Sequence, residues 1–360
     1  MAFTEETRTM MAFSWLFRNR LRKAHSLLEQ YGTATEVWNH LDEDGMQQAL
    51  RRADEEAAFA ERHRIEVLTL RDDTYPFRLR QCPDAPLLLY SKGCPRPNEG
   101  RMVSVVGTRE CTERGKELTR RLVLDLAAML PDVTIISGLA YGIDVEAHKA
   151  ALEAGIPTLI ITGHGLDRIY PAYHRNIAVR ALDNGGILTE YMSGTDPDRQ
   201  NFIARDRIIA GLADAVVVVE SKEKGGALIT ARMALDYDRS LFAFPGRVQD
   251  VTSQGCNLLI RDQKAGLIQG AEDLIAAMMW KTETDRRPPV QTEMTELFEP
   301  LSEQEERLLH AIRSQEDGIH VNFLQAECGL PYPDTVSTLT LMEMKGLVKA
   351  LPGGIYRALR

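Results

Sequence analysis

A short apolar run that ends in a turn of small residues recurs five times between residues 102 and 246, and a helical pattern follows each turn. The runs are rich in valine and isoleucine, which is typical of strands covered by helices on both faces. They end at Val106, Ile136, Ile161, Leu188 and Val219. In a parallel sheet these turns meet at one edge, where helix N-termini favour phosphate. The sequence therefore predicts an α/β fold with a row of anion-binding turns.

Composition limits the class of protein. The chain has 360 residues, which favours two or three domains, and 44% of them are hydrophobic, enough for a packed core. A formal net charge of −9 argues against a nucleic-acid binder unless basic groups are concentrated locally. The five cysteines form no CxxC pair, so neither a disulfide framework nor a zinc site is expected, and a reducing cytoplasm is the simplest location. The first twenty residues do not resemble a signal peptide, and no apolar run approaches the roughly 20 residues of a membrane span.

Four regions are expected along the chain. Residues 1–85 indicate a helical module and a connector, with Gly32 separating two helices. Residues 86–280 hold the repeated strand, turn and helix units. Residues 281–300 are charged, contain paired prolines and lack periodicity, which is typical of a linker. Residues 301–360 predict three helices and a hairpin, the pattern of a winged helix-turn-helix.

The turn after the first strand, Gly107-Thr108-Arg109, combines groups that suit phosphate. Gly107 would let a ligand approach the backbone, Thr108 offers a hydroxyl, and Arg109 supplies a planar and permanent charge. An ordinary tight turn with an exposed arginine is the alternative.

Two further turns are rich in glycine. Ser137-Gly138 opens the second turn, and Asp144 is positioned to cap the helix that follows. Because this run is not GxGxxG and lacks a ribose-reading acid, a dinucleotide cofactor is disfavoured, and packing alone explains the run equally well. Gly225-Gly226 opens another helix but lacks the Lys-Ser/Thr ending of a P-loop, so ATP hydrolysis is not expected.

The strongest local signal is the run from Arg199 to Gly211, RQNFIARDRIIAG. Arg205 and Arg207 lie at the expected start of an apolar helix, where two cations oppose the helix dipole. A bound anion would offset that cost. A buried salt bridge to Asp144 or Glu190 would offset it as well, so one of the two arginines could serve the fold alone.

The remaining signals are weaker. Tyr170, Tyr173 and Arg175 place two rings and a cation near the same edge, where bases could stack, although a proline-led helix start with packed tyrosines is the alternative. Glu220 ends a strand and is expected to orient an arginine. The eight histidines are dispersed, so no metal site is expected, and no catalytic constellation stands out.

Together these motifs resemble one family, the DprA/Smf family of bacterial DNA-processing protein A. The matching strings follow the family's order across residues 105–247, and they are VVGTRECTERG, SGLAYGIDVEAHKAAL, ILTEY, FIARDRIIAGLADAVVVVES, GGALITARMAL and FAFPG. The flanking helical and winged-helix modules match a common layout of the family.

The resemblance implies an extended Rossmann-type doubly wound sheet that binds single-stranded DNA, forms a homodimer and carries neither a cofactor nor a catalytic activity. It implies a role in DNA recombination during natural transformation. Family members load the recombinase RecA onto incoming single strands in the cytoplasm, and they relieve the block that the single-strand-binding protein imposes.

The family's DNA pocket carries over to Arg109, to Arg199 ahead of Phe202, and to Arg205 and Arg207. Phe202 would stack a base. The turns at Ser137-Gly138 and Gly225-Gly226 would line the same edge, next to Gly107 and Thr108.

The chain departs from the family in two places. Asp206 stands where the family usually has asparagine between two arginines, which lowers the local positive charge. Asn176 comes later in the sequence than the asparagine of the family's YPxxN motif. Arg175 is therefore assigned to the site by its position in the sequence and not by a motif match. The third helix of the winged module has Lys345 as its one cation, which favours a protein contact over DNA reading.

Two other functions compete with this interpretation. A phosphoribohydrolase on the same fold would need a PGGxGTxxE-type loop, and Pro245-Gly246-Arg247 does not match it. A transcription regulator would use the winged helix on duplex DNA and the Rossmann domain as a nucleotide sensor.

Overall fold

The computed structural model describes residues 3–282, 301–315, 318–351 and 353–359. The chain divides into two compact units, Met1–Arg286 and Arg287–Arg360. The N-terminal helices pack into the same unit as the sheet, so the expected boundary between residues 85 and 86 stays a prediction. Most of the expected linker, from residue 283 to residue 300, lies outside the described residues.

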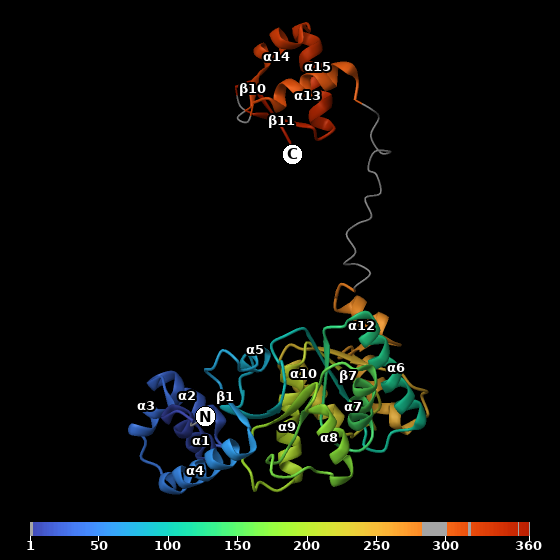
Figure 1. Ribbon diagram of the computed structural model, residues 1–360. Coiled ribbons are helices and arrows are strands. Elements are labelled where there is room, and N and C mark those ends of the chain that lie inside the picture. The colour runs from blue at the N-terminus through green and yellow to red at the C-terminus, as the bar shows by residue number, and fades with distance from the viewer. Residues whose placement is uncertain (1–2, 283–300, 316–317, 352, 360) are drawn as a thin grey trace. The chain divides into compact units, whose positions relative to one another are not determined.

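Residues 3–65 are helical, as the sequence predicts, but they contain four helices instead of two. They are α1 (Glu5–Leu16), α2 (Leu21–Tyr31), α3 (Ala34–Asn39) and α4 (Met46–His63). Gly32 ends α2 with a positive φ of 93°, and Thr33 begins α3 through a capping box with Glu36. The four helices share one apolar core with the first two strands, and Figure 1 shows them beside β1 (Glu66–Thr69).

The sheet of the first unit has nine strands in the order β1-β2-β6-β5-β4-β3-β7-β8-β9. From β6 to β9 along this order all neighbours are parallel, whereas β1 pairs with β2, and β2 with β6, antiparallel. The bounds are β1 (Glu66–Thr69), β2 (Leu88–Gly93), β3 (Arg101–Val106), β4 (Val133–Ser137), β5 (Thr158–Ile161), β6 (Gly185–Thr189), β7 (Ala215–Val218), β8 (Ser240–Ala243) and β9 (Gly266–Leu267).

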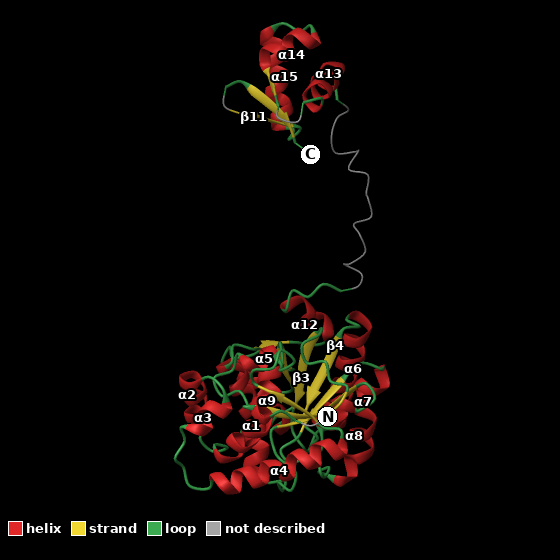
Figure 2. Ribbon diagram, turned by 60° about the vertical axis from the view of Figure 1, so that its left-hand side comes forward, coloured by secondary structure: helices red, strands yellow, loops and turns green. Residues whose placement is uncertain are grey.

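Helices cover both faces of this sheet because successive strand residues point to opposite sides. Val105 packs in the core that includes α6 (Glu113–Met129) and α7 (Ile143–Ala154), and Val106 packs in the core that includes α9 (Arg199–Leu212) and α10 (Ala227–Asp236). Figure 2 shows β3 and β4 between these two layers. The bounds are α5 (Phe77–Arg80), α6 (Glu113–Met129), α7 (Ile143–Ala154), η1 (Ala172–His174), α8 (Arg175–Ala181), α9 (Arg199–Leu212), α10 (Ala227–Asp236), η2 (Val251–Ser253), α11 (Gln254–Arg261) and α12 (Ala271–Ala277).

The strand order reverses beside β3. The chain runs outward from β3 through β4 and β5 to β6, and then returns to the other side of β3 to form β7. In doubly wound sheets ligands bind in the crevice at such a switch point, outside the carboxyl ends of the strands. The turns after β3 and β7 therefore flank the expected binding crevice, and the predicted α/β fold class is confirmed.

The second unit is a winged helix, as predicted. Its elements are α13 (Glu303–Arg313), β10 (Ile319–His320), α14 (Val321–Cys328), α15 (Tyr332–Met344), β11 (Val348–Leu351) and β12 (Ile355–Ala358), with strand order β10-β12-β11. Ser302 and Glu305 form a capping box at the start of α13. Lys345, the residue after α15, pairs with Glu305 at 2.6 Å, so the one cation predicted for the third helix serves the fold of this unit.

Within the described ranges of the chain, helices long and apolar enough to cross a membrane are absent.

Candidate nucleic-acid interface

A cleft of about 640 Å³ lies at the switch point, between the turn after β3, the turn after β7 and the first half of α9. Six cations line it, and they are Arg109, Arg199, Arg205, Lys222, Lys224 and Arg232. Four acids line it too, and they are Glu110, Asp144, Asp206 and Glu223. Cations therefore outnumber acids in this cleft although the whole chain has a net charge of −9. The overall acidity does not argue against an anionic ligand here.

The cleft brings together eight of the twelve predicted site residues. They are Gly107, Thr108, Arg109, Arg199, Phe202, Arg205, Gly225 and Gly226. Arg109, from the turn after β3, and two arginines of α9, Arg199 and Arg205, thus line the same cleft. Ser137, Gly138, Arg175 and Arg207 do not line it.

Phe202 lies at the boundary between this cleft and a smaller hollow of about 40 Å³. Its ring stacks on Tyr170 with centroids 5.7 Å apart and planes 27° apart. The Cζ atoms of Arg109 and Arg205 lie 5.8 Å and 5.9 Å from the Phe202 centroid. A half-buried ring near two guanidinium groups can pack against a flat group whose phosphates the arginines bind.

Arg205 is buried, with a relative exposure of 4%. Its Nε donates to Asp206 Oδ1 at 3.1 Å, and its Nη1 donates to the carbonyl of Ile161. Helix α9 begins at Arg199, with Asp198 as its N-cap. The prediction that Arg205 and Arg207 lie at a helix start is therefore wrong, because the helix begins six residues before Arg205.

Arg207 serves the fold. Its guanidinium forms an ion pair with Glu190 and donates to the carbonyl of Asp84 at 2.8 Å. Both partners of the ion pair are largely buried. Burial raises the pKa of Glu190, and the charge of Arg207 opposes that rise. The salt-bridge alternative of the sequence analysis holds for this arginine.

Ser137 and Gly138 lie behind the cleft wall. The hydroxyl of Ser137 donates to the carbonyl of Val105 at 2.6 Å, and the side chain is fully buried. A Cβ on Gly138 would lie 2.6 Å from Asp144 Oδ2 and 2.7 Å from Arg205 Nη1. Glycine is required here because two charged side chains approach its backbone.

Asp144 does not cap α7, contrary to the prediction. The N-cap is Gly142, and no side chain caps this helix. Asp144 is instead buried at the cleft wall, where burial raises its pKa to about 7 while Arg205 and Arg109 oppose that rise.

Glycine occurs in the two flanking turns for different structural reasons. A Cβ on Gly107 would lie 2.4 Å from Ile143 Cγ1, so packing against α7 requires this glycine. A Cβ on Gly225 would lie 2.3 Å from Ser221 Oγ, whereas Gly226 faces open space. Of these three, only Gly226 leaves room for a ligand next to its backbone.

Glu220 binds the start of α6, and the expectation that it orients an arginine is not met. Its carboxylate accepts hydrogen bonds from the Thr112 amide at 2.9 Å and from the Thr112 hydroxyl at 2.5 Å. Thr112 is the N-cap of α6. Arg175 is exposed at the start of α8 and lies outside the cleft lining.

Family comparisons agree with the motifs in the sequence. Residues 66–279 match the family model described as DNA recombination-mediator protein A, and residues 293–354 match the DprA winged helix domain. The chain belongs to the DNA recombination-mediator protein A family. The predicted membership of the DprA/Smf family is thereby confirmed.

Several family members are similar to this chain. It is 38% identical to DNA processing protein DprA of Streptococcus pneumoniae over 57% of this chain and 71% of the relative. It is 33% identical to protein Smf of Synechocystis over 81% of this chain and 80% of the relative.

Two solved structures of DNA processing protein A are similar too. The X-ray structure of the protein from Streptococcus pneumoniae has a TM-score of 0.66 and 30% identity, and the match covers 77% of this chain and 98% of that one. A structure from Helicobacter pylori, described for its single-stranded DNA binding mode, has a TM-score of 0.53 and 29% identity. That match covers 59% of this chain and 96% of the other.

Sequence reasoning missed several residues that line the cleft of this recombination-mediator family member. Lys222 and Lys224 directly precede the Gly225-Gly226 turn, and this proximity could have identified them. Lys222 Nζ pairs with a Glu110 carboxylate oxygen at 2.6 Å, which joins the turns after β7 and β3. Arg232 lies further along α10, and only the fold brings it to the cleft.

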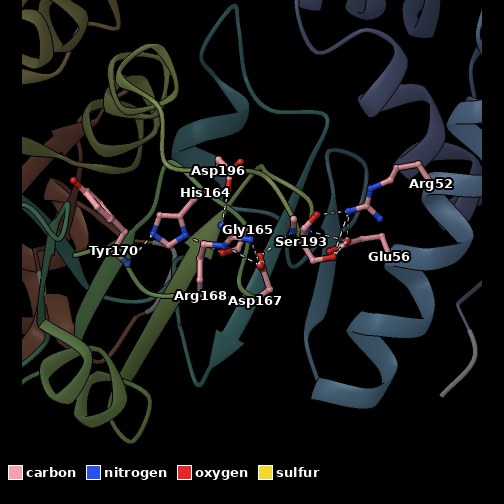
Figure 3. A network of polar contacts seen from close by, with 10 residues as sticks. Arg52, Glu56, His164, Gly165, Asp167, Arg168, Tyr170, Ser193 and Asp196 are labelled. Atoms are coloured by element: carbon pink, nitrogen blue, oxygen red, sulfur yellow. Dashed lines mark hydrogen bonds and ion pairs between the residues drawn. The ribbon is translucent and has the colours of Figure 1, made fainter. Parts of the chain in front are cut away.

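A polar network anchors the segment of residues 192–198, which leads into α9 (Figure 3). The buried Glu56 of α4 accepts hydrogen bonds from the Ser193 amide at 2.9 Å and from Arg52 at 3.0 Å. Further along the segment, the Gly194 amide donates to Asp167 at 2.9 Å. The N-terminal helices thus fix the segment that leads into α9, the helix that carries Arg199 and Phe202.

Among the described residues, no group of three or more metal-binding side chains lies close enough together to hold an ion.

Proposed function

We propose that this protein is a non-catalytic mediator that binds single-stranded DNA and loads RecA onto it during natural transformation. Membership of the recombination-mediator family supports the proposal, as does the described DNA binding of the Helicobacter pylori protein. The observation that carries it is the convergence of Arg109, Arg199 and Arg205 on one cleft beside Phe202.

The cleft suits an unpaired strand. Arg109 and Arg199 are exposed and would contact phosphates, which gives affinity without sequence preference and a strong dependence on salt. Phe202 would stack against a base, because every base has a flat face that an aromatic ring can cover. Bases paired in a duplex are stacked within it, so single strands would bind more tightly than duplex.

The partners are part of the same proposal. RecA and the single-strand-binding protein would meet this chain on incoming DNA in the cytoplasm, and the chain would act as a homodimer. The winged helix would contact a protein, since its third helix exposes Leu341 and Met344 and offers no cation other than Lys345.

The experiment is fluorescence anisotropy with labelled oligo-thymidylate over a range of salt concentrations. Arg109→Ala and Arg199→Ala should each weaken binding by about 1.5 kcal/mol, roughly tenfold, because each removes a charge-assisted contact. Each should also lower the slope of log K against log salt by about 0.7. Arg121→Ala on α6 is the control, since its side chain is exposed and lies outside the cleft.

Other outcomes would favour the competing functions. Tighter binding of duplex than of single strand would support a transcription regulator. Release of free base from a nucleoside monophosphate would support an enzyme of the phosphoribohydrolase type.

A further inference from the structure

Two carboxylates approach one buried guanidinium at the wall of the cleft. Asp206 accepts a hydrogen bond from Arg205 Nε at 3.1 Å. Asp144 Oδ2 and Arg205 Nη1 lie 2.6 Å and 2.7 Å from one point, the position that a Cβ would take on Gly138. Arg205 and both carboxylates line the cleft. We call these three side chains the acid–guanidinium cluster.

The other charged groups near the cluster come from few elements. Arg109, in the turn after β3, lowers the pKa of both carboxyl groups, and Thr230 of α10 lowers the pKa of Asp206. Two histidines lie close by but are uncharged at neutral pH. Burial lowers the pKa of His148 to about 4, and burial lowers the pKa of His164 as well. The carboxylates are therefore the groups of this cluster that can change charge near neutral pH.

The charges of the cluster do not balance when every group is ionised. Two carboxylates then lie near one buried guanidinium, which forms an ion pair with Asp206, and the pKa values of both carboxyl groups are raised, mainly by burial. A phosphate that enters the cleft adds a further negative charge next to the same guanidinium. Electrostatic repulsion in a buried site is poorly screened. A proton on one carboxyl group removes the excess charge.

We infer that a DNA phosphate binds in this cleft together with a proton, which is taken up by the acid–guanidinium cluster, and that Asp144 is the main acceptor. This inference rests on the proposed function and adds a residue that sets affinity. Asp144 is a positioning residue in this scheme, since it acts on the phosphate through Arg205.

The direction of the pH dependence follows from linkage. Below the pKa of about 7, Asp144 is already protonated, and its proton has no effect on binding. Above that value the free protein has lost the proton, and the complex must take it up again. Affinity should therefore fall by up to about tenfold per pH unit above pH 7, as expected for one proton.

The test measures the affinity of rhodamine-labelled oligo-thymidylate between about pH 6 and pH 9 at constant ionic strength. The wild type should show constant affinity at the acidic end and a slope near one proton above neutrality. Asp144→Asn should bind at pH 8.5 about as tightly as the wild type binds at pH 6, with little slope. Asp125→Asn on α6, outside the cleft, should keep the wild-type slope.

Calorimetry on the unmodified protein tests the inference without any substitution. Binding heats measured at pH 8 in two buffers with different ionisation enthalpies give the number of protons taken up, which should lie near one. Tight binding with no proton uptake, or an unchanged slope in Asp144→Asn, would overturn this inference and leave the proposed function intact. Failure of the wild type to bind the oligonucleotide at any pH would overturn the proposed function instead.

Discussion

Replacing Glu190 with leucine should lower the free energy of unfolding by about 3–5 kcal/mol, because it leaves the buried charge of Arg207 without its carboxylate. The measurement is urea unfolding followed by tryptophan fluorescence. All three tryptophans, at positions 15, 38 and 280, belong to the first unit, so the signal reports the sheet and its helices.

Two further variants make the Glu190 test specific. The double variant Glu190→Leu with Arg207→Met should recover most of the loss, since apolar side chains of similar size replace a buried ion pair at little cost. Glu99→Leu should leave the unfolding midpoint unchanged, because the ion pair of Glu99 with Arg96 is exposed. A midpoint for Glu190→Leu that matches the Glu99→Leu value would contradict a structural role for the pair.

Replacing Phe202 with alanine should weaken the binding of oligo-thymidylate by about 1–3 kcal/mol, the usual contribution of one base stacked on an aromatic side chain. Anisotropy titrations at fixed salt measure the effect. The salt slope should stay at the wild-type value, because the arginines that contact phosphate remain in place.

The matched control for Phe202→Ala is Phe77→Ala. Phe77 is also partly exposed, on α5, and lies outside both hollows of the site. Phe202→Trp should keep most of the affinity, since the indole offers a flat face of similar reach. Equal losses from Phe202→Ala and Phe77→Ala would exclude base stacking at this position.

Several helix ends can be predicted from the sequence, because a local cause defines them. Thr112 begins α6, Gly155 ends α7, and Ser302 begins α13, each through a cap that needs only neighbouring residues. The parallel sheet followed from apolar runs at regular spacing.

The roles of the side chains on α9 could be predicted only from the correct position of the helix start. Residues two apart on a helix point about 200° apart, so Arg205 and Arg207 cannot face one site. Arg205 faces the cleft, and Arg207 faces the connector at Asp84. The sequence analysis placed the start of the helix near Arg205, and so it missed that the two arginine side chains point in opposite directions. The helical periodicity of the run already implies these directions.

Other roles depend on contacts that the sequence does not carry. Gly107 is glycine because Ile143, thirty-six residues later, packs against it. Asp144 does not cap α7 because it lies inside the helix, after the N-cap Gly142, and its side chain lines the cleft near Arg205 of α9. Such pairs become visible only when the sheet has placed both layers at one edge.

The attachment of Ser193 to Glu56 has a consequence for deletion mapping. A shortened protein that starts at Glu66, the first residue matched by the family model, would keep the complete lining of the cleft. It would nevertheless release the stretch that presents Arg199 and Phe202, because Arg52 and Glu56 would be missing. Deletion experiments would then assign DNA affinity to helices α1–α4, none of which contributes a described residue to that surface.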